Sequence, residues 1–165
     1  LILERATTLS VSNYLEQKLW SRIMEHDALF STDSKESNFE YMPSRLIARA
    51  IDYARFGQLM LNEGNWYGNQ LISKDWIQES TQENKSIPRD IYPKWFGRSD
   101  KRIYYNYHWW GHVNNDGTFN FYANGNLGQN IYIIPDKDTV IVHLGNSLKY
   151  YSSDFDLWNV ALQLN

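Results

Sequence analysis

The stretch from Tyr104 to Gly145 constrains the fold most, because residues that favour strands alternate there with residues that favour tight turns. Asn114-Asn115-Asp116-Gly117 and Pro135-Asp136-Lys137-Asp138 have the composition of hairpin turns. Four short strands are predicted, at about 104–112, 118–123, 129–134 and 139–145. Consecutive strands joined by tight turns favour an antiparallel meander.

Helical patterns dominate the chain before this stretch. Ser10, Ser44 and Ser73 each precede a segment with helical spacing and are predicted N-caps, and Gly64 is predicted to end the second helix. The pattern predicts helices at about 10–20, 45–62, 74–82 and 153–164, and irregular loops at 26–44 and 83–103. Because helices and strands occur in separate blocks, we expect an α+β fold, mainly helical over 1–103 and mainly strands with a last helix over 104–165.

Composition excludes several classes of function. The 165 residues suit one domain, and a net charge of −3 provides no basic field for nucleic acid. No apolar run approaches the length of about 18 residues that a membrane span needs. The chain has no cysteine, and its four histidines lack the spacing of zinc ligands. We therefore expect no disulfide, no metal site and no cofactor.

Two glycines interrupt the strand pattern between Ala123 and Gln129. Gly125 and Gly128 lie three residues apart there, and glycine inside a strand marks a bulge or a close approach to the backbone. One hypothesis is an oxyanion-binding strand edge, because backbone N–H groups stabilise an oxyanion best when no side chain intervenes. The alternative is an ordinary bulge in a curved sheet.

An aromatic cluster precedes this tract. If 104–112 is one strand, Tyr105, Tyr107 and Trp109 share a face, and His108 and Trp110 lie on the other. One face is then core, and the other lines a substrate pocket. The alternative is that both faces are core, since most buried aromatic side chains only pack.

No activated nucleophile is recognisable in these residues. The sequence contains no G-x-S-x-G elbow, no phosphate-binding loop, no dinucleotide fingerprint and no Ser-x-x-Lys.

Several segments, taken in order along the chain, resemble the serine β-lactamase-like family. That family includes class C β-lactamases, D-Ala-D-Ala carboxypeptidases, esterases and 6-aminohexanoate-dimer hydrolases. The similar segments are 1–7, 10–15, 18–20, 24–28, 48–57, 107–110, 125–129, and 135–145 with its Pro135, Asp138 and Val140–Gly145. The resemblance implies the C-terminal part of a β-lactamase/transpeptidase-like fold, with part of the helical subdomain.

The family's machinery has three motifs, and only the third is expected in this chain, which begins after the place of the second. The third motif, Lys/His/Trp-x-Gly, is matched best by Ala123-Asn124-Gly125, which would make the N–H of Asn126 an oxyanion donor. A second register, Asn126-Leu127-Gly128, would give that role to the N–H of Gln129. In either register the expected Lys, His or Trp is replaced, which puts an electrostatic or proton-relay role for this position in doubt.

The resemblance therefore implies the C-terminal half of a serine hydrolase that cleaves a small-molecule amide or ester through an acyl-serine intermediate. Asn124, Gly125 and Asn126 are its candidate catalytic residues, and the candidate substrate-binding residues are Tyr107, Trp109, Trp110 and Gln129. The missing N-terminal half is the expected partner, the chain alone is expected to be inert, and an exported or periplasmic location would suit the family. The alternatives are a catalytically dead member, or a binding module for a small ligand, peptide or glycan. An open edge of the meander would also permit self-association.

Overall fold

The structure is a computed structural model that describes residues 2–40, 46–88, 102–146, 160 and 163. Contacts divide the chain into two compact units, Leu1–Phe56 and Gly57–Asn165. Each unit is described by itself. The division expected near residue 103, between helical and strand-rich parts, stays a prediction.

The first unit opens with short helices: α1 (Ile2–Thr7), α2 (Val11–Leu15), the π-helical turn η1 (Glu16–Trp20) and α3 (Ser21–Ile23). The Ser10 hydroxyl accepts a hydrogen bond from the N–H of Asn13 at 3.2 Å, so the predicted N-cap is confirmed. The helical path continues three residues past the predicted end at Trp20. Trp20 is buried, and its indole N–H donates to the carbonyl of His26 at 2.8 Å.

The predicted loop at 26–44 contains paired backbone. Strand β1 (Leu29–Phe30) pairs antiparallel with β2 (Leu46–Ile47), and Thr32 forms an isolated bridge with Glu40. The carboxylate of Glu40 accepts hydrogen bonds from both the N–H and the hydroxyl of Ser12. The prediction of irregular structure is therefore wrong at these positions, because two-residue strands carry too little pattern to be recognised.

Helix α4 (Ala50–Leu61) begins five residues later than predicted. Leu46 and Ile47 continue the helical spacing of apolar residues but pair as a strand instead. The N–H of Arg49 is satisfied by the Asp52 carboxylate at 3.2 Å, which is one half of a capping box. The predicted cap, Ser44, lies outside the described residues.

Glycine ends α4 as predicted. Gly64 has φ +81° and donates its N–H to the carbonyl of Leu59 at 2.8 Å, closing the helix end. A small hairpin of β3 (Asn65–Trp66) and β4 (Asn69–Gln70) follows and turns at Tyr67-Gly68. Helix α5 (Lys74–Thr81) starts at its predicted cap, where the Ser73 hydroxyl accepts from the N–H of Trp76 at 3.3 Å.

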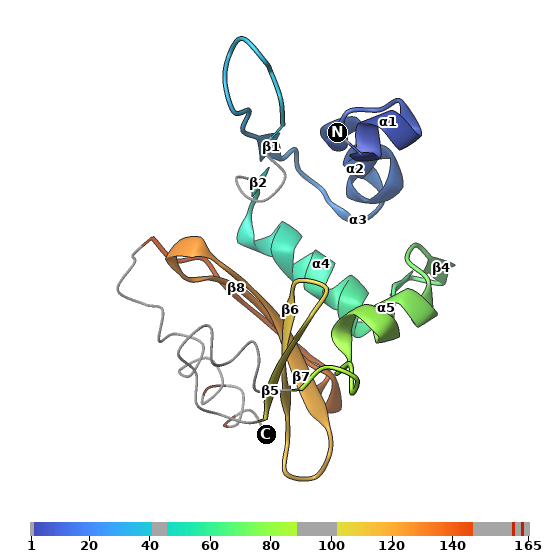
Figure 1. Cartoon of the computed structure of the whole chain (residues 1–165), viewed down its shortest axis with the longest axis vertical. Coiled ribbons are helices and arrows are strands. Elements are labelled where there is room, and N and C mark those ends of the chain that lie inside the picture. Colours follow the sequence, from blue (N-terminus) through green and yellow to red (C-terminus); the bar gives the residue numbers. More distant parts are fainter. Residues whose placement is uncertain (1, 41–45, 89–101, 147–159, 161–162, 164–165) are drawn as a thin grey trace. The chain divides into compact units, whose positions relative to one another are not determined.

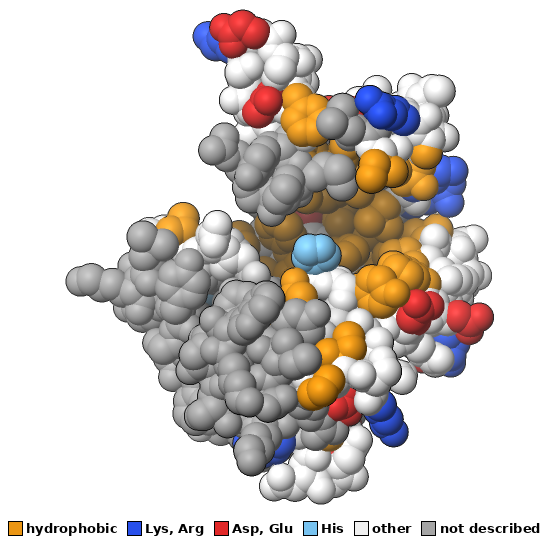
Figure 2. Space-filling model, in the orientation of Figure 1, with side chains coloured by type: hydrophobic (Ala, Val, Ile, Leu, Met, Phe, Trp, Pro, Cys, Tyr) orange, Lys and Arg blue, Asp and Glu red, His pale blue; other side chains and the backbone are white. Residues whose placement is uncertain are grey.

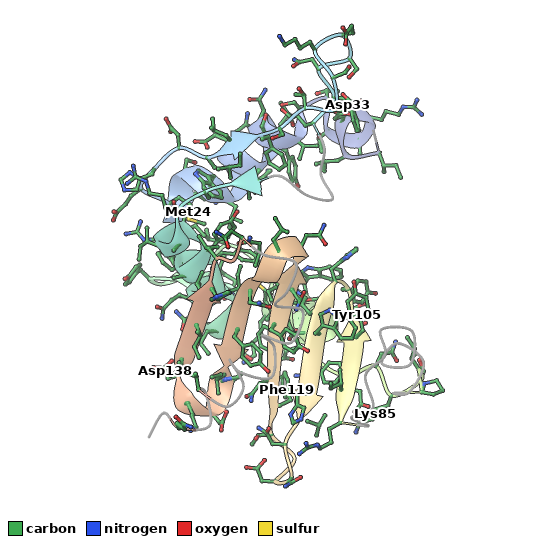
Figure 3. The ribbon with its side chains drawn as sticks, turned by 90° about the vertical axis from the view of Figure 1, so that its left-hand side faces the viewer. Met24, Asp33, Lys85, Tyr105, Phe119 and Asp138 are labelled. Atoms are coloured by element: carbon green, nitrogen blue, oxygen red, sulfur yellow. The ribbon has the colours of Figure 1, made fainter. Side chains whose placement is uncertain are left out.

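The second unit is built on an antiparallel meander (Figures 1 and 3). In Figure 3 the strands lie side by side, with Tyr105 on the outermost strand at one edge and Asp138 at the turn of the opposite edge. The strands are β5 (Ile103–Asn106), β6 (Trp109–Val113), β7 (Phe119–Gly125), β8 (Gln129–Ile134) and β9 (Thr139–His143), in that order across the sheet. The predicted meander and α+β class are confirmed. The outer strands of the described sheet are β5 and β9, and self-association through them stays a prediction.

The predicted strand at 104–112 is wrong, because it is two strands joined by a two-residue turn. Tyr107 and His108 occupy that turn with φ of 42° and 70°, the left-handed pair that a tight hairpin needs. The turn lacks the glycine or asparagine that usually marks such a site. The prediction that Tyr105, Tyr107 and Trp109 share a face falls with it, and Tyr105 pairs with Trp110 instead.

The two faces of the sheet differ in character. One face centres on Trp110, Tyr122 and Tyr132, and the rings of the two tyrosines stack 4.7 Å apart. On the other face, Gly57 of α4 lies so close to strand β9 that an added Cβ would be 2.5 Å from Val140. The predicted helix at 153–164 lies almost wholly outside the described residues.

Strand β5 is tied to α5 through a glycine. The ring of Tyr104 covers Gly111, its cross-strand partner, and the Tyr104 hydroxyl then reaches the carbonyl of Thr81 at 2.7 Å. A side chain at position 111 would occupy the space of the ring.

We therefore expect Gly111→Ala to lower the free energy of unfolding by about 1–3 kcal/mol, the usual cost of overpacking a filled site. Urea denaturation of the purified protein measures this loss. Gly125→Ala is the matched control, because the nearest atom to its Cβ would be the Cβ of Gln129, at 3.3 Å. Equal losses in the two variants would contradict the overlap with Tyr104.

Candidate active-site turn and adjoining pocket

The glycine tract forms the connection between β7 and β8. Asn124 and Gly125 end β7, the residues Asn126–Gly128 form the short helical turn η2, and Gln129 opens β8 opposite Gly125. The tract is thus a hairpin turn rather than a bulge within one strand.

Backbone conformation separates the roles of the two glycines. Gly128 has φ +84°, which favours glycine, and Leu127 before it has φ +65°. Gly125 is extended, with φ −108° and ψ 171°, so its conformation does not require glycine. What glycine provides at position 125 is a strand end without a side chain.

Asn126 is the first residue of the turn that follows this bare strand end. The first N–H groups of a helical turn have no carbonyl acceptor inside it. The N–H of Asn126 is therefore without a carbonyl acceptor inside the turn. The side chains that flank the turn are engaged, since Gln129 Nε2 donates to the Gly145 carbonyl and Asn130 Nδ2 to the Gly128 carbonyl.

The register puts a second turn at the same end of the sheet. Trp110 pairs with Tyr122, so the Tyr107-His108 turn and the end of β7 lie at one end of the meander. The structure thus brings Tyr107 to the same sheet end as the candidates Asn124–Asn126 and Gln129.

The predicted pocket residues Trp109 and Trp110 do not accompany Tyr107. They point to opposite faces and are buried, Trp110 beside Tyr105 with ring centroids 4.8 Å apart, and Trp109 against Phe121 at 5.3 Å. Both therefore serve as core residues of the described sheet, whereas half of the Tyr107 side chain is exposed.

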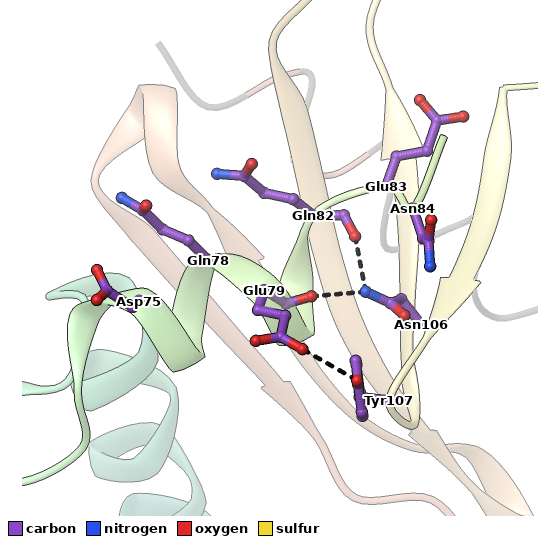
Figure 4. A pocket seen from close by; sticks show the side chains of 8 residues that line it. All are labelled: Asp75, Gln78, Glu79, Gln82, Glu83, Asn84, Asn106 and Tyr107. Atoms are coloured by element: carbon purple, nitrogen blue, oxygen red, sulfur yellow. Dashed lines mark hydrogen bonds between the residues drawn. The ribbon is translucent and has the colours of Figure 1, made fainter. Parts of the chain in front are cut away.

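A cavity of about 480 Å³ adjoins the Tyr107-His108 turn (Figure 4). Sequence reasoning missed this cavity, because its residues come from helix α5, the segment after it and the tip of the β5–β6 hairpin. The lining residues are Asp75, Gln78, Glu79, Gln82, Glu83, Asn84, Asn106 and Tyr107.

Hydrogen bonds shape the floor of this cavity. Asn106 Nδ2 donates to the carbonyls of Glu79 and Gln82 at 2.7 and 3.0 Å, so strand β5 supplies donors for the end of α5. The Tyr107 hydroxyl donates to Glu79 Oε1 at 3.1 Å. This hydrogen bond, and the negative charge of Glu79, raise the pKa of Tyr107 above its ordinary value.

Three tripeptides, Tyr67-Gly68-Asn69, Tyr104-Tyr105-Asn106 and Tyr122-Ala123-Asn124, match the letters of a Tyr-x-Asn motif without the geometry of a catalytic group. Tyr122 is buried, and its ring stacks on that of Tyr132. Tyr67 is 90% exposed at a hairpin tip, and the Tyr104 hydroxyl is bonded to the Thr81 carbonyl.

Within the part of the chain that the structure describes, no group of three His, Asp or Glu side chains could hold a metal ion. No described helix is both long and apolar enough to cross a membrane. Acidic, basic and uncharged side chains are interspersed on the face shown in Figure 2.

Comparison with known proteins assigns the family. The model of the beta-lactamase family matches residues 1–165, the whole chain. The chain belongs to the beta-lactamase family. The resemblance seen in the sequence is thereby confirmed.

The relatives within this family include 6-aminohexanoate-dimer hydrolases. The chain is 27% identical over 148 residues to the 6-aminohexanoate-dimer hydrolase of Paenarthrobacter ureafaciens. The matched region covers 88% of this chain and 36% of the relative. A solved structure from Bacillus anthracis, titled as a candidate 6-aminohexanoate-dimer hydrolase, is similar with a TM-score of 0.78 and 30% identity. That match covers 97% of this chain and 40% of the other. The chain therefore spans about two fifths of the length of these relatives.

Proposed function

We propose that this chain is the oxyanion-binding part of a serine hydrolase that cleaves an amide or ester bond through an acyl-serine intermediate. The observation that carries the proposal is the β7–β8 turn, where the bare strand end at Gly125 is followed by the N–H of Asn126 at the start of η2. Of the two registers proposed for the third motif, Ala123-Asn124-Gly125 is the one whose residues lie on a strand. We therefore take Asn126 N–H as the donor.

The chemistry divides between this chain and the rest of such a hydrolase. A serine oxygen attacks the carbonyl carbon of the substrate, and the carbonyl oxygen gains negative charge in the tetrahedral intermediate. The N–H of Asn126 donates a hydrogen bond to that oxygen. The C–N or C–O bond then breaks, the amine or alcohol leaves with a proton, and water releases the acid from the acyl-serine. The serine and its base would come from residues outside these 165, since the sequence holds no Ser-x-x-Lys.

The names of the relatives support the choice of substrate class. Their printed names describe hydrolases of a 6-aminohexanoate dimer, a small linear amide. We propose a small-molecule amide of this kind, or a related ester, as the substrate. The Asn126 position offers a neutral side chain next to the donor, so this chain contributes hydrogen bonding rather than charge.

A fluorophosphonate probe, which forms a covalent bond to an activated serine, tests the proposal directly. We expect the full-length gene product to take up one adduct, on a serine outside these 165 residues, and the 165-residue chain alone to take up none. Intact-mass analysis with peptide mapping measures both. Absence of an adduct on the full-length protein would instead support a catalytically dead family member, and an adduct on the short chain would refute the inert fragment.

The donor role of Asn126 has its own test, because proline removes the backbone N–H while alanine keeps it. Gly125 is extended, a conformation that the residue before proline accepts, so Asn126→Pro is compatible with the local backbone. In the full-length protein we expect Asn126→Pro to lower kcat by about 10²–10³-fold, the effect of losing one oxyanion donor. Asn126→Ala, the matched control, should retain most of the activity. Similar losses in both variants, with hydrolysis of a chromogenic ester as the assay, would show that the side chain and not the N–H matters.

The cavity beside α5 favours a second candidate function, binding of a glycan or another polyhydroxylated ligand. Carboxylate and amide side chains line it, and Tyr107 at its edge packs against the half-exposed Trp76 with ring centroids 5.0 Å apart. Amides and carboxylates bond sugar hydroxyls, and exposed aromatic rings pack against the apolar face of a sugar.

Binding of the protein to a glycan array, measured at increasing protein concentration, tests this second candidate. If it is right, binding is saturable in the wild type and is lost in Tyr107→Ala. Tyr67→Ala serves as the matched control, because Tyr67 is also exposed but lies on the β3–β4 hairpin. Binding that both variants retain, or no binding at all, would reject the cavity as a glycan site.

A further inference from the structure

The β7–β8 turn is held from outside by the end of strand β9. His143, the last residue of β9, places its Nδ1 atom 2.7 Å from the carbonyl oxygen of Gly128. Gln129 Nε2 donates to the carbonyl of Gly145, which lies two residues after His143. Side chains from the turn and from the strand end therefore each bond the backbone of the other segment. Asn130 Nδ2 adds a donor to the same Gly128 oxygen at 3.2 Å.

The chemistry of the acceptor determines that the Nδ1 atom of the His143 ring carries hydrogen. A carbonyl oxygen only accepts hydrogen bonds, so Nδ1 must carry the proton. This donor is present in the neutral ring with hydrogen on Nδ1 and also in the protonated ring. The bond to Gly128 therefore persists whether His143 is neutral or charged.

The turn needs such support because its backbone is strained. Leu127 has φ +65°, a left-handed conformation that costs a non-glycine residue about 1–2 kcal/mol. Strained conformations of this kind persist where surrounding contacts over-determine them. Gly145 contributes by its lack of a side chain, since a Cβ there would overlap the carbonyl of Leu127.

The strand register places His143 beside the β7–β8 turn. Asn124, Asn130 and His143 occupy one cross-strand row, Asn124 opposite Asn130 and Asn130 opposite His143. The row lies directly beside η2. A hydrogen bond from its last member to the Gly128 carbonyl thus connects the edge strand β9 to the turn that begins with Asn126.

We propose that His143 is a positioning residue that holds the β7–β8 turn, through the Gly128 carbonyl, so that the Asn126 N–H points at the substrate oxyanion. The inference rests on the proposed function for its catalytic consequence, and on the geometry alone for the support of the turn. Displacing a catalytic group by about 1 Å costs on the order of 10²-fold in rate, so a loosened turn lowers kcat while leaving substrate binding largely unchanged.

Three variants distinguish the effect of the Nδ1 hydrogen bond from the effect of side-chain volume. His143→Asn keeps an N–H₂ group at the position of Nδ1, His143→Gln places its amide nitrogen at the position of Nε2, and His143→Leu removes the donor. In the full-length protein we expect His143→Leu and His143→Gln to lower kcat by about 10–100-fold with little change in KM, and His143→Asn to recover most of kcat. Thermal unfolding of each variant checks that it is folded at the assay temperature.

A second readout does not depend on activity. In the 165-residue chain, ¹⁵N relaxation should give order parameters near about 0.85 for Asn126–Gly128 in the wild type and in His143→Asn, falling toward about 0.6 in His143→Leu. Unchanged order parameters in His143→Leu would overturn the support of the turn, whatever the kinetics show. Reduced order parameters with kcat unchanged in an active enzyme would overturn the positioning role. A third outcome is reduced order parameters in His143→Leu together with no hydrolysis by the full-length wild-type protein. That outcome would support the role of His143 in holding the turn and would reject the proposed function instead.

Discussion

The contact between the Tyr104 ring and Gly111 is the constraint on which the second unit depends. It keeps β5 and β6 in one register, because a slip of one residue would put a side chain under the ring. It also carries the Tyr104 hydroxyl to the end of α5, where Asn106 supplies two further hydrogen bonds. The position of α5 on the sheet follows from these bonds, and with it the cavity between α5 and the hairpin tip.

The aromatic face of the sheet is apolar at its centre and polar at one end. Its centre is apolar, with Tyr122 stacked on Tyr132, but the end next to η2 carries Asn124, Asn130 and His143. Asn130 is almost fully buried, and among the described residues its Oδ1 has no hydrogen-bond partner. A buried unpaired oxygen costs about 1–3 kcal/mol, which an apolar residue would avoid. Polar residues kept at such a cost are typical of a functional site, and these lie beside the turn proposed to bind the oxyanion.

The features predicted correctly from the sequence are those with local chemical causes. Ser10 and Ser73 cap their helices, Gly64 ends α4, and the turns at 114–117 and 135–138 lie between the expected strands. The failures come from tertiary pairing. Leu46 and Ile47 fit a helix but pair with β1, and Tyr107-His108 forms a turn without glycine because Tyr104 and Asn106 are held by α5. The cavity could not be predicted, since its residues gather only when α5 meets the hairpin.

The site at the β7–β8 turn stays a prediction, and the residue that sequence reasoning missed there is instructive. Glycine spacing drew attention to residues 123–129, but His143 was recognised only as a histidine without metal-ligand spacing. Its significance depends on a backbone carbonyl 15 residues away in sequence, which no side-chain pattern reveals. In the proposed register Ala123 takes the place of the Lys, His or Trp expected from the family, and Asn126 is neutral, so the proposed site would rely on backbone donors. A side chain can adjust its rotamer to a substrate, whereas a backbone N–H points only where the turn holds it. A site of this kind therefore demands a rigid turn, and the hydrogen bonds from Gln129, Asn130 and His143 supply that rigidity.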